Sequence, residues 1–104
     1  MSEKDKLMLK QMLKLTPKQQ KTFMDDADNE YILFLCECVL NALEGNVRIS
    51  VAELQPFEKS LRILRRKSAS YWQRRKTLKS NSGLKILKLI GKPCTNYLDL
   101  CHGS

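Results

Sequence analysis

The segment "YILFLCECVLNALEG", Tyr31 to Gly45, decides the fold class of this 104-residue chain. Its apolar residues recur every three or four positions, which is the spacing of one face of an α-helix. The acidic segment "DDADNE" before it supplies residues that cap helix N-termini, and Gly45 stands where a left-handed residue closes a helix. The sequence therefore predicts a buried helix between the two, at the centre of the core.

Similar start signals recur on both sides of this helix. Three pairs of residues have the spacing of a capping box: Thr16 with Gln19, Ser50 with Glu53, and Ser70 with Gln73. Pro56 lies inside the helix expected after Ser50, so we predict either a bend there or a regular helix only from Phe57. These signals predict an all-α fold, a small single-domain bundle of four to five short helices.

The expected domain spans residues 1–92, with its core at about 17–80, and residues 93–104 are predicted to be a flexible, less ordered tail. The segment "LKILKLIGK", residues 84–92, fits a helix, but the spacing of its Lys residues also allows a strand. The expected core residues are Tyr31, Leu35, Val39, Leu40, Leu43, Leu54, Phe57, Leu61 and Leu64. The predicted core thus comes from the central helix and from the helix that follows Ser50.

Charge is distributed unevenly along the chain. The formal net charge is +8, and residues 51–104 contain twelve Lys or Arg against three acids. Between Lys59 and Leu98 there is no acidic residue at all. Such an asymmetry is typical of a protein that binds a polyanion, most often nucleic acid and sometimes an anionic membrane surface.

No apolar run in the sequence reaches the eighteen or so residues of a membrane span, and the first residues do not resemble a signal-peptide core. We therefore expect an intracellular protein, in the cytoplasm or nucleus, whose four cysteines are thiols. Cys36 and Cys38 would point about 200° apart on a helix. The sequence therefore predicts buried thiols in preference to a zinc site that combines them with Cys94, Cys101 and His102.

Side chains suited to catalysis are scarce. The single histidine, His102, stands near the end of the sequence, and helix capping accounts for the acids of "DDADNE". That segment also lacks the glycine and the distal glutamate of an EF-hand calcium loop. We therefore expect no enzymatic activity, no catalytic residues, no metal and no cofactor.

The stretch "LRRKSASYWQRRKTLK", Leu64 to Lys79, has seven basic residues, two aromatic residues and no acid. One interpretation is a solvated helix face, with Trp72 anchoring its helix on the core. The other is a nucleic-acid-binding surface, on which cations neutralise phosphates and aromatic rings stack on bases. The candidate nucleic-acid-binding residues are Arg62, Arg65, Arg66, Lys67, Tyr71, Trp72, Arg74, Arg75, Lys76 and Lys79.

A shorter pattern lies within the same stretch. Arg65 and Arg66 precede Ser68 at the spacing that basophilic kinases recognise. A phosphate on Ser68 would place negative charge inside the basic block and weaken anion binding.

The segment "LCECVLNALEGNVRIS", Leu35 to Ser50, is followed by a Lys/Arg-rich helix and by a Ser-Gly before an apolar tail. This order resembles a small basic protein of Maverick/Polinton-type DNA transposons and the related adintoviruses of animals. The resemblance covers roughly residues 20–90 and is carried by the Cys-x-Cys, the "N-x-L-x-G-N" turn and the basic block. Where members of that family have Gly-Gly and a longer apolar C-terminus, this chain has "SNSGLKILKLIGK". The resemblance implies an accessory or virion-associated protein of a virus-like element, and it carries over no established enzymatic activity.

We therefore predict a non-enzymatic protein that binds nucleic acid mainly through phosphates and independently of sequence. No recognition-helix signature or RNA-binding aromatic motif separates DNA from RNA as the ligand. The alternative is a protein-interaction or assembly module whose basic face meets an acidic partner. Stable membrane anchoring is not expected, because the amphipathic segment "GLKILKLIGK" is short.

Overall fold

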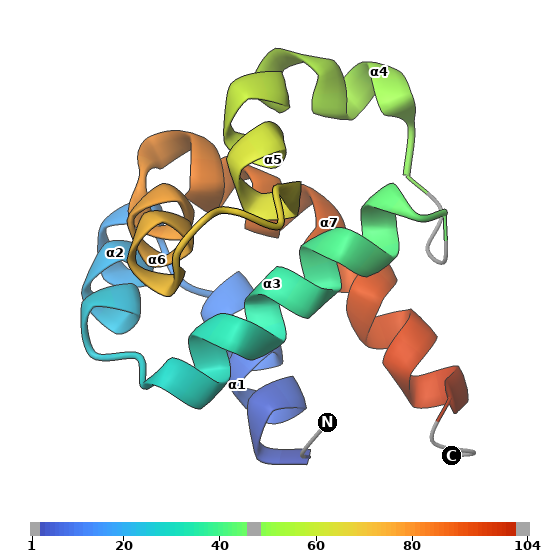
Figure 1. Ribbon diagram of the computed structural model, residues 1–104. Helices are drawn as coiled ribbons and strands as arrows, with labels where there is room; N and C mark the ends of the chain where they lie inside the picture. The colour runs from blue at the N-terminus through green and yellow to red at the C-terminus, as the bar shows by residue number, and fades with distance from the viewer. Residues whose placement is uncertain (1–2, 46–48, 102–104) are drawn as a thin grey trace.

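The computed structural model describes residues 3–45 and 49–101, and every regular element in this part of the chain is helical (Figure 1). The elements are α1 (Glu3–Leu13), α2 (Pro17–Asp25), α3 (Asn29–Leu43), α4 (Val51–Leu54), the 3-10 turn η1 (Gln55–Phe57), α5 (Glu58–Arg65), α6 (Tyr71–Lys79) and α7 (Asn81–Cys101). The prediction of an all-α fold is confirmed. Because α4, η1 and α5 follow one another without a break, the described residues form six separate helical stretches, more than the four to five predicted.

Helix α3 forms where the sequence predicted the central helix. Asp28 caps it, since its Oδ1 accepts a hydrogen bond from the backbone N–H of Tyr31 at 2.9 Å. Gly45 lies just beyond its C-terminus with φ +83°, the left-handed conformation predicted for this position. Leu35 and Val39 are buried on its inner side. Local signals in the sequence therefore place both ends of α3 correctly.

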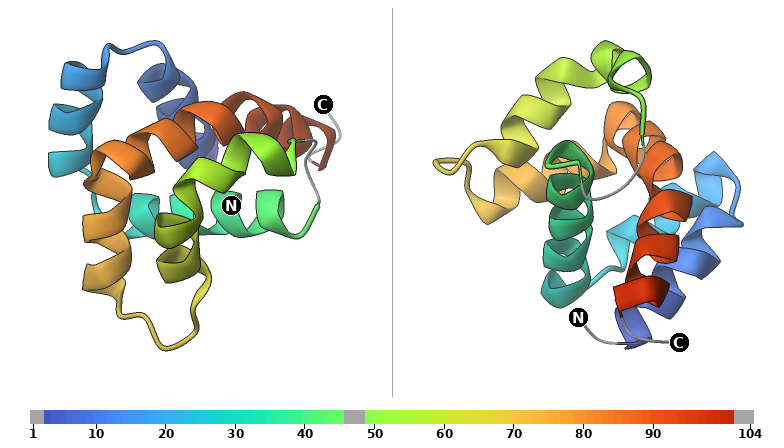
Figure 2. Two further views of the ribbon diagram at one scale, coloured as in Figure 1. Left: turned by 90° about the horizontal axis from the view of Figure 1, so that it is seen from above. Right: turned by 90° about the vertical axis from the view of Figure 1, so that its right-hand side faces the viewer.

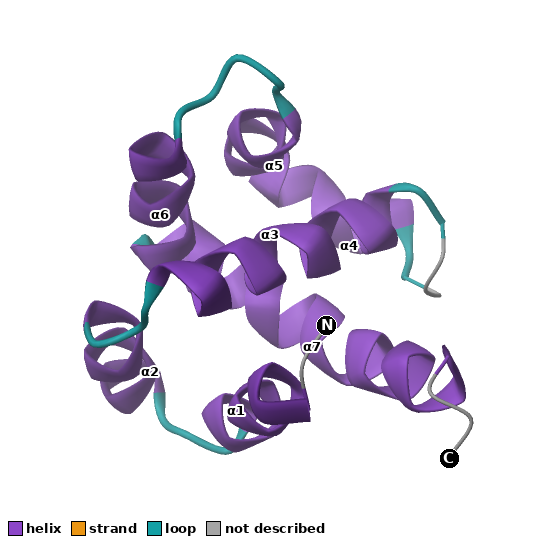
Figure 3. Ribbon diagram, turned by 60° about the horizontal axis from the view of Figure 1, so that its bottom comes forward, coloured by secondary structure: helices purple, strands orange, loops and turns teal. Residues whose placement is uncertain are grey.

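Helix α7, with 21 residues, is the longest element, and it packs against α1, α3 and α6. Figure 3 shows α3 and α7 crossing near the middle of the molecule, with α1 and α2 below them and α5 and α6 above. The buried residues of α7 include Leu84, Ile86, Leu87, Ile90 and Cys94, whereas its exposed residues include Lys85, Lys88 and Lys92. Of the two alternatives for residues 84–92, the helix is therefore correct.

The core is wider than the predicted range of residues 17–80. Helix α1 contributes Leu9 and Met12, and α7 contributes its buried face. The Tyr31 hydroxyl donates to Met12 Sδ at 3.6 Å, which ties α3 to α1. Six of the nine predicted core residues are buried, and three are half-buried: Leu40, Leu43 and Phe57.

The less ordered tail predicted for residues 93–104 is helical as far as Cys101, so that expectation is wrong for residues 93–101. Helix α7 continues past Pro93 because the next two residues, Cys94 and Thr95, are buried, and burial compensates for the backbone hydrogen bond that proline cannot form. The Thr95 hydroxyl also donates to the Lys92 carbonyl at 2.9 Å. Residues 102–104 lie outside the described part of the chain.

Local capping signals also predict the starts of the shorter helices. Thr16 with Gln19 forms a reciprocal capping box at α2, and Ser70 with Gln73 forms one at α6. Around Pro56 the chain forms the 3-10 turn η1, and the regular helix α5 begins directly after it. The interruption predicted from Pro56 is therefore present.

A single residue, Ser80, separates α6 from α7. Its Oγ accepts a hydrogen bond from the Gly83 N–H at 3.1 Å, which caps the start of α7. Gly83 lies so close to the end of α6 that an added Cβ would come within 2.6 Å of the Leu78 Cα and would also meet the Thr77 carbonyl oxygen. The tight corner between the two helices therefore requires glycine at position 83.

We expect Gly83→Ala to destabilise the fold by about 1–3 kcal/mol, because the backbone atoms that the new methyl group meets cannot move aside. Gly91→Ala is the matched control, since the three atoms nearest to its methyl group would all belong to the flexible side chain of Leu13, and the higher helix propensity of alanine offsets their displacement. Thermal unfolding followed by circular dichroism measures both. Equal stability of the two variants would contradict the packing at this corner.

Candidate nucleic-acid interface

The loop of residues 66–70 joins α5 to α6 and projects from the body of the molecule (Figure 2). Arg66 ends α5 with an extended backbone, at φ −69° and ψ 125°, whereas Ala69 turns inward and is buried. The Ala69 N–H donates to the Arg66 carbonyl at 3.1 Å, which closes the turn. As a result, Arg65, Arg66, Lys67 and Ser68 are all exposed.

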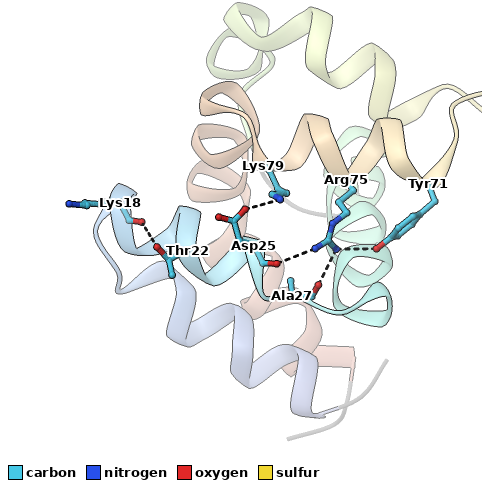
Figure 4. Close-up of polar contacts among 7 residues, drawn as sticks. All are labelled: Lys18, Thr22, Asp25, Ala27, Tyr71, Arg75 and Lys79. Atoms are coloured by element: carbon cyan, nitrogen blue, oxygen red, sulfur yellow. Dashed lines mark hydrogen bonds and ion pairs between the residues drawn. The ribbon is translucent and has the colours of Figure 1, made fainter.

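Arg75 of α6 reaches across to the linker between α2 and α3 (Figure 4). Its Nη1 donates to the Ala27 carbonyl at 3.0 Å and to the Tyr71 hydroxyl at 3.1 Å. Its Nη2 donates to the Asp25 carbonyl at 3.4 Å. The Tyr71 hydroxyl donates in turn to Asn29 Oδ1 at 2.6 Å. Arg75 and Tyr71 therefore hold α6 against the turn that leads into α3.

Lys79, one turn after Arg75, pairs with Asp25, with 2.7 Å between Nζ and Oδ1 (Figure 4). The hydrogen bond from Lys79 lowers the pKa of Asp25 below its ordinary value of 3.8. The pair therefore contributes to stability above pH 3.8, and that contribution is lost as the pH falls through the lowered pKa. Because both side chains are partly exposed, solvent screening keeps the contribution small.

Arg74 lies between the loop and α3. Its Nη2 donates to the Arg66 carbonyl at 2.9 Å, and its Nε is buried without a hydrogen-bond partner among the described residues. Its side chain lines a cavity of about 490 Å³ together with residues of α1 and α3: Asp5, Glu30, Leu33, Phe34, Cys36, Glu37 and Leu40. Burial raises the pKa of the Cys36 thiol, and the charge of Arg74 partly opposes this. Arg74 is thus engaged largely within the fold.

Trp72 is 71% exposed, compared with 54% for Leu7 and 49% for Leu33, the other large hydrophobic residues found exposed where side chains are described. Its ring meets Tyr71 edge to face, with 5.2 Å between the ring centroids. Beside it lies a surface groove of about 430 Å³, lined by Trp72, Arg75, Lys76, Lys79 and Ser80. The interpretation of Trp72 as a core anchor is therefore wrong.

Nine of the ten predicted site residues fall into two sets, and Arg62 stands apart from both. Tyr71, Arg74, Arg75 and Lys79 make contacts that hold α6 in place. The outer set consists of residues that are exposed and have no ion pair or side-chain hydrogen bond in the described part of the chain: Arg65, Arg66, Lys67, Trp72 and Lys76. Arg62 is also exposed and pairs with Glu58 at 2.9 Å, but an exposed pair of this kind is weak and can be exchanged for another anion.

Three cations of α7 were not among the predicted site residues. Lys85, Lys88 and Lys92 are exposed on α7, on the side opposite its buried residues. Their spacing of three and four residues was visible in the sequence, but it separates a cationic face from an apolar one only if the segment is helical. They enlarge the positive surface of the second half of the chain.

Three of the four cysteines, Cys36, Cys38 and Cys94, are buried, as predicted. All three are free thiols in the core. Contact with the Cys94 thiol, together with burial, raises the pKa of Cys38 and favours its protonated form. No group of His, Cys, Asp and Glu side chains in the described ranges is arranged to hold a metal ion. For Cys101 the structure describes the backbone alone, and His102 lies outside the described residues, so the part of the predicted alternative that involves them is not covered.

Within residues 3–45 and 49–101, no helix combines the length and the apolar character needed to cross a membrane.

Comparisons with protein-family models, curated proteins and solved structures gave no match to this chain. The resemblance to the Maverick/Polinton-type proteins therefore stays a prediction from the sequence. The interpretation of the site depends on its geometry, which separates the cations that hold α6 from those of the outer set.

Arg75 and Lys76 are neighbours in sequence with opposite environments. We expect Arg75→Ala to lower the free energy of unfolding by about 1.5–3 kcal/mol, because it removes charge-assisted hydrogen bonds to the turn before α3. Lys76→Ala is the control and should change it by less than about 0.5 kcal/mol, because Lys76 is exposed. Urea denaturation measures both values, and equal effects would show that Arg75 does not hold α6.

Proposed function

We propose that this protein binds nucleic acid through the outer set, mainly by phosphate contacts and without sequence preference. The observation that carries the proposal is the exposed ring of Trp72, which shares a groove with Lys76 on a helix that follows three exposed cations. A base can stack on an exposed aromatic ring while neighbouring cations neutralise its phosphates. DNA and RNA both offer these two chemical groups.

The charge distribution supports the same function. No acidic residue lies between Lys59 and Leu98, so the repulsion among the cations of this region is not relieved by carboxylates of the same segment. Among the described acids, Glu58 already pairs with Arg62 and Asp25 with Lys79. A polyanion would relieve the repulsion among the outer cations and release its own counterions on binding.

The placement of the outer set on α6 suits a strand that runs along this helix. Trp72 lies in the first turn of α6, directly after the loop that bears Arg65, Arg66 and Lys67. Lys76 lies four residues later and therefore on the same face of the helix. A nucleobase stacked on Trp72 would thus have cations available for the phosphates on both of its sides.

Removal of the four outer cations should weaken binding in a salt-dependent way. We expect the combined change of Arg65, Arg66, Lys67 and Lys76 to Gln to flatten the slope of log K against log salt by about 3.6 on a mixed-sequence duplex, at about 0.9 for each lost phosphate contact. Fluorescence anisotropy titrations between about 50 and 200 mM salt measure this slope.

The matched control removes four cations from the opposite half of the chain. Lys4, Lys14, Lys18 and Lys21 are exposed on α1, α2 and the turn between them, and their change to Gln gives the same net charge. The slope of log K against log salt for this control should stay close to that of the wild type. An equal loss in both variants would show that binding follows net charge alone, and no binding by the folded wild type at about 50 mM salt would refute the function.

Trp72 provides a separate test of stacking. We expect Trp72→Ala to weaken single-stranded binding by about 1–3 kcal/mol, because a stacked base is lost. Duplex binding should change little, and the unfolding free energy should stay within about 0.5 kcal/mol because the ring is exposed. Trp72→Phe, which keeps an aromatic face, should restore most of the single-stranded affinity. Equal losses on single and double strands would exclude stacking.

A second candidate function, docking of an acidic protein segment, is favoured by a groove of about 470 Å³. It is lined by residues of α3, α4, α5 and the chain between them: Ala42, Leu43, Gly45, Ile49, Leu54, Gln55, Glu58, Leu61, Arg62 and Arg65. Its floor is largely apolar, and two arginines against one glutamate leave its rim positive, so an amphipathic helix with acidic flanks would match both. Binding of a designed helix of that kind, lost on Arg62→Glu with Arg65→Glu, would support this function.

A further inference from the structure

Ser68 carries an exposed hydroxyl group in the basic segment that makes no hydrogen bond within the described residues. Hydroxyls at other positions of this segment make hydrogen bonds to the backbone, namely those of Ser70, Thr77, Ser80 and Thr95. Ser60 and Ser82 are half-buried within α5 and α7. Ser70 and Ser80 are exposed as well, but Ser68 is the one of these serines that is both exposed and without a hydrogen bond to its Oγ within the described residues.

The residues before Ser68 define the enzyme that could reach it. Arg65 and Arg66 stand three and two positions upstream, and both are exposed and without an ion pair among the described residues. A kinase whose peptide groove carries carboxylates selects substrates through such cations. The loop projects from the body, and Arg66 already has an extended backbone (Figure 2). For the segment to enter a groove, the last residue of α5, Arg65, would have to leave its helix, and the turn that Ala69 closes onto Arg66 would have to open.

We propose that Ser68 is a phosphorylation site for a basophilic serine/threonine kinase that uses ATP. In this step the Ser68 Oγ attacks the γ-phosphorus of ATP and forms a new O–P bond. The bond between the γ-phosphorus and the β,γ-bridging oxygen breaks, and ADP leaves. The hydroxyl proton passes to a catalytic carboxylate of the kinase.

The consequence for binding rests on the proposed function of the outer set. A phosphoserine carries about −1.5 to −2 charges at pH 7, and it would stand next to Lys67 and two residues from Arg66. Those cations would pair with the new phosphate in place of the phosphates of a nucleic acid. Phosphorylation of Ser68 should therefore weaken nucleic-acid binding as much as the loss of about two contacts to nucleic-acid phosphates would.

The first experiment tests the modification alone. The folded full-length protein is incubated with purified cyclic-AMP-dependent protein kinase and Mg-ATP, and the products are mapped by peptide mass spectrometry. We expect one phosphoryl group on Ser68, none on that loop in Ser68→Ala, and a rate at least tenfold lower in Arg65→Gln with Arg66→Gln, which keeps the acceptor. No phosphate on Ser68, or an undiminished rate in the double Gln variant, overturns the site.

The second experiment tests its effect on the proposed function. The purified phosphorylated protein should show a salt slope on a mixed-sequence duplex about two units flatter than that of the unmodified protein, and phosphatase should restore it. Phosphorylation without a change of slope overturns the regulatory effect and leaves the site established. If the unmodified protein does not bind nucleic acid, the proposed function fails, whatever the mass spectra show.

Discussion

Burial of the apolar face of α7 is the constraint on which the rest of this structure depends. Ile86, Leu87 and Ile90 are almost completely buried, and the helix that carries them contacts α1, α2, α3 and α6. Short helices cannot form a core alone, and their stability comes mainly from packing of their apolar faces. The tight corner at Ser80 and Gly83 fixes the angle between α6 and α7. The packing of α7 therefore determines which side of α6 faces solvent.

The orientation of α6 gives a physical role to each of two adjacent cations. Consecutive residues of a helix point about 100° apart, so Arg75 faces α2 while Lys76 faces solvent. The carbonyls of Asp25 and Ala27, which Arg75 binds, stand at the C-terminal end of α2, where carbonyls lack helical partners and a positive charge is favourable. Arg75 therefore completes the end of one helix from the side of another.

Much of this fold could be predicted from local signals. The caps at Thr16 and Ser70, the left-handed Gly45 and the apolar spacing of α3 each depend on residues close in sequence, and each was placed correctly. The continuation of α7 past Pro93 could not be predicted, because it depends on the burial of Cys94 against other helices. The division of the basic residues into those that hold α6 and those of the outer set could not be predicted from the sequence for the same reason. A run of arginines and lysines does not reveal which of them meets the carbonyls of a helix distant in sequence, and an exposed Trp72 contradicts the usual role of tryptophan in a small core.

The loop before α6 also contains both a serine that stabilises the helix and a serine that does not. Ser70 accepts the Gln73 N–H in the capping box, so a phosphate there would remove a cap and act on the helix itself. Ser68 lies two residues earlier, outside that box, and the buried Ala69 between them anchors the turn. Charge can therefore be added at Ser68 without changing the contacts that fix α6. In the proposed regulation, the orientation of Trp72 and Lys76 would therefore stay constant while the charge beside them changes, so phosphorylation would alter the proposed affinity for nucleic acid and not the stability of the fold.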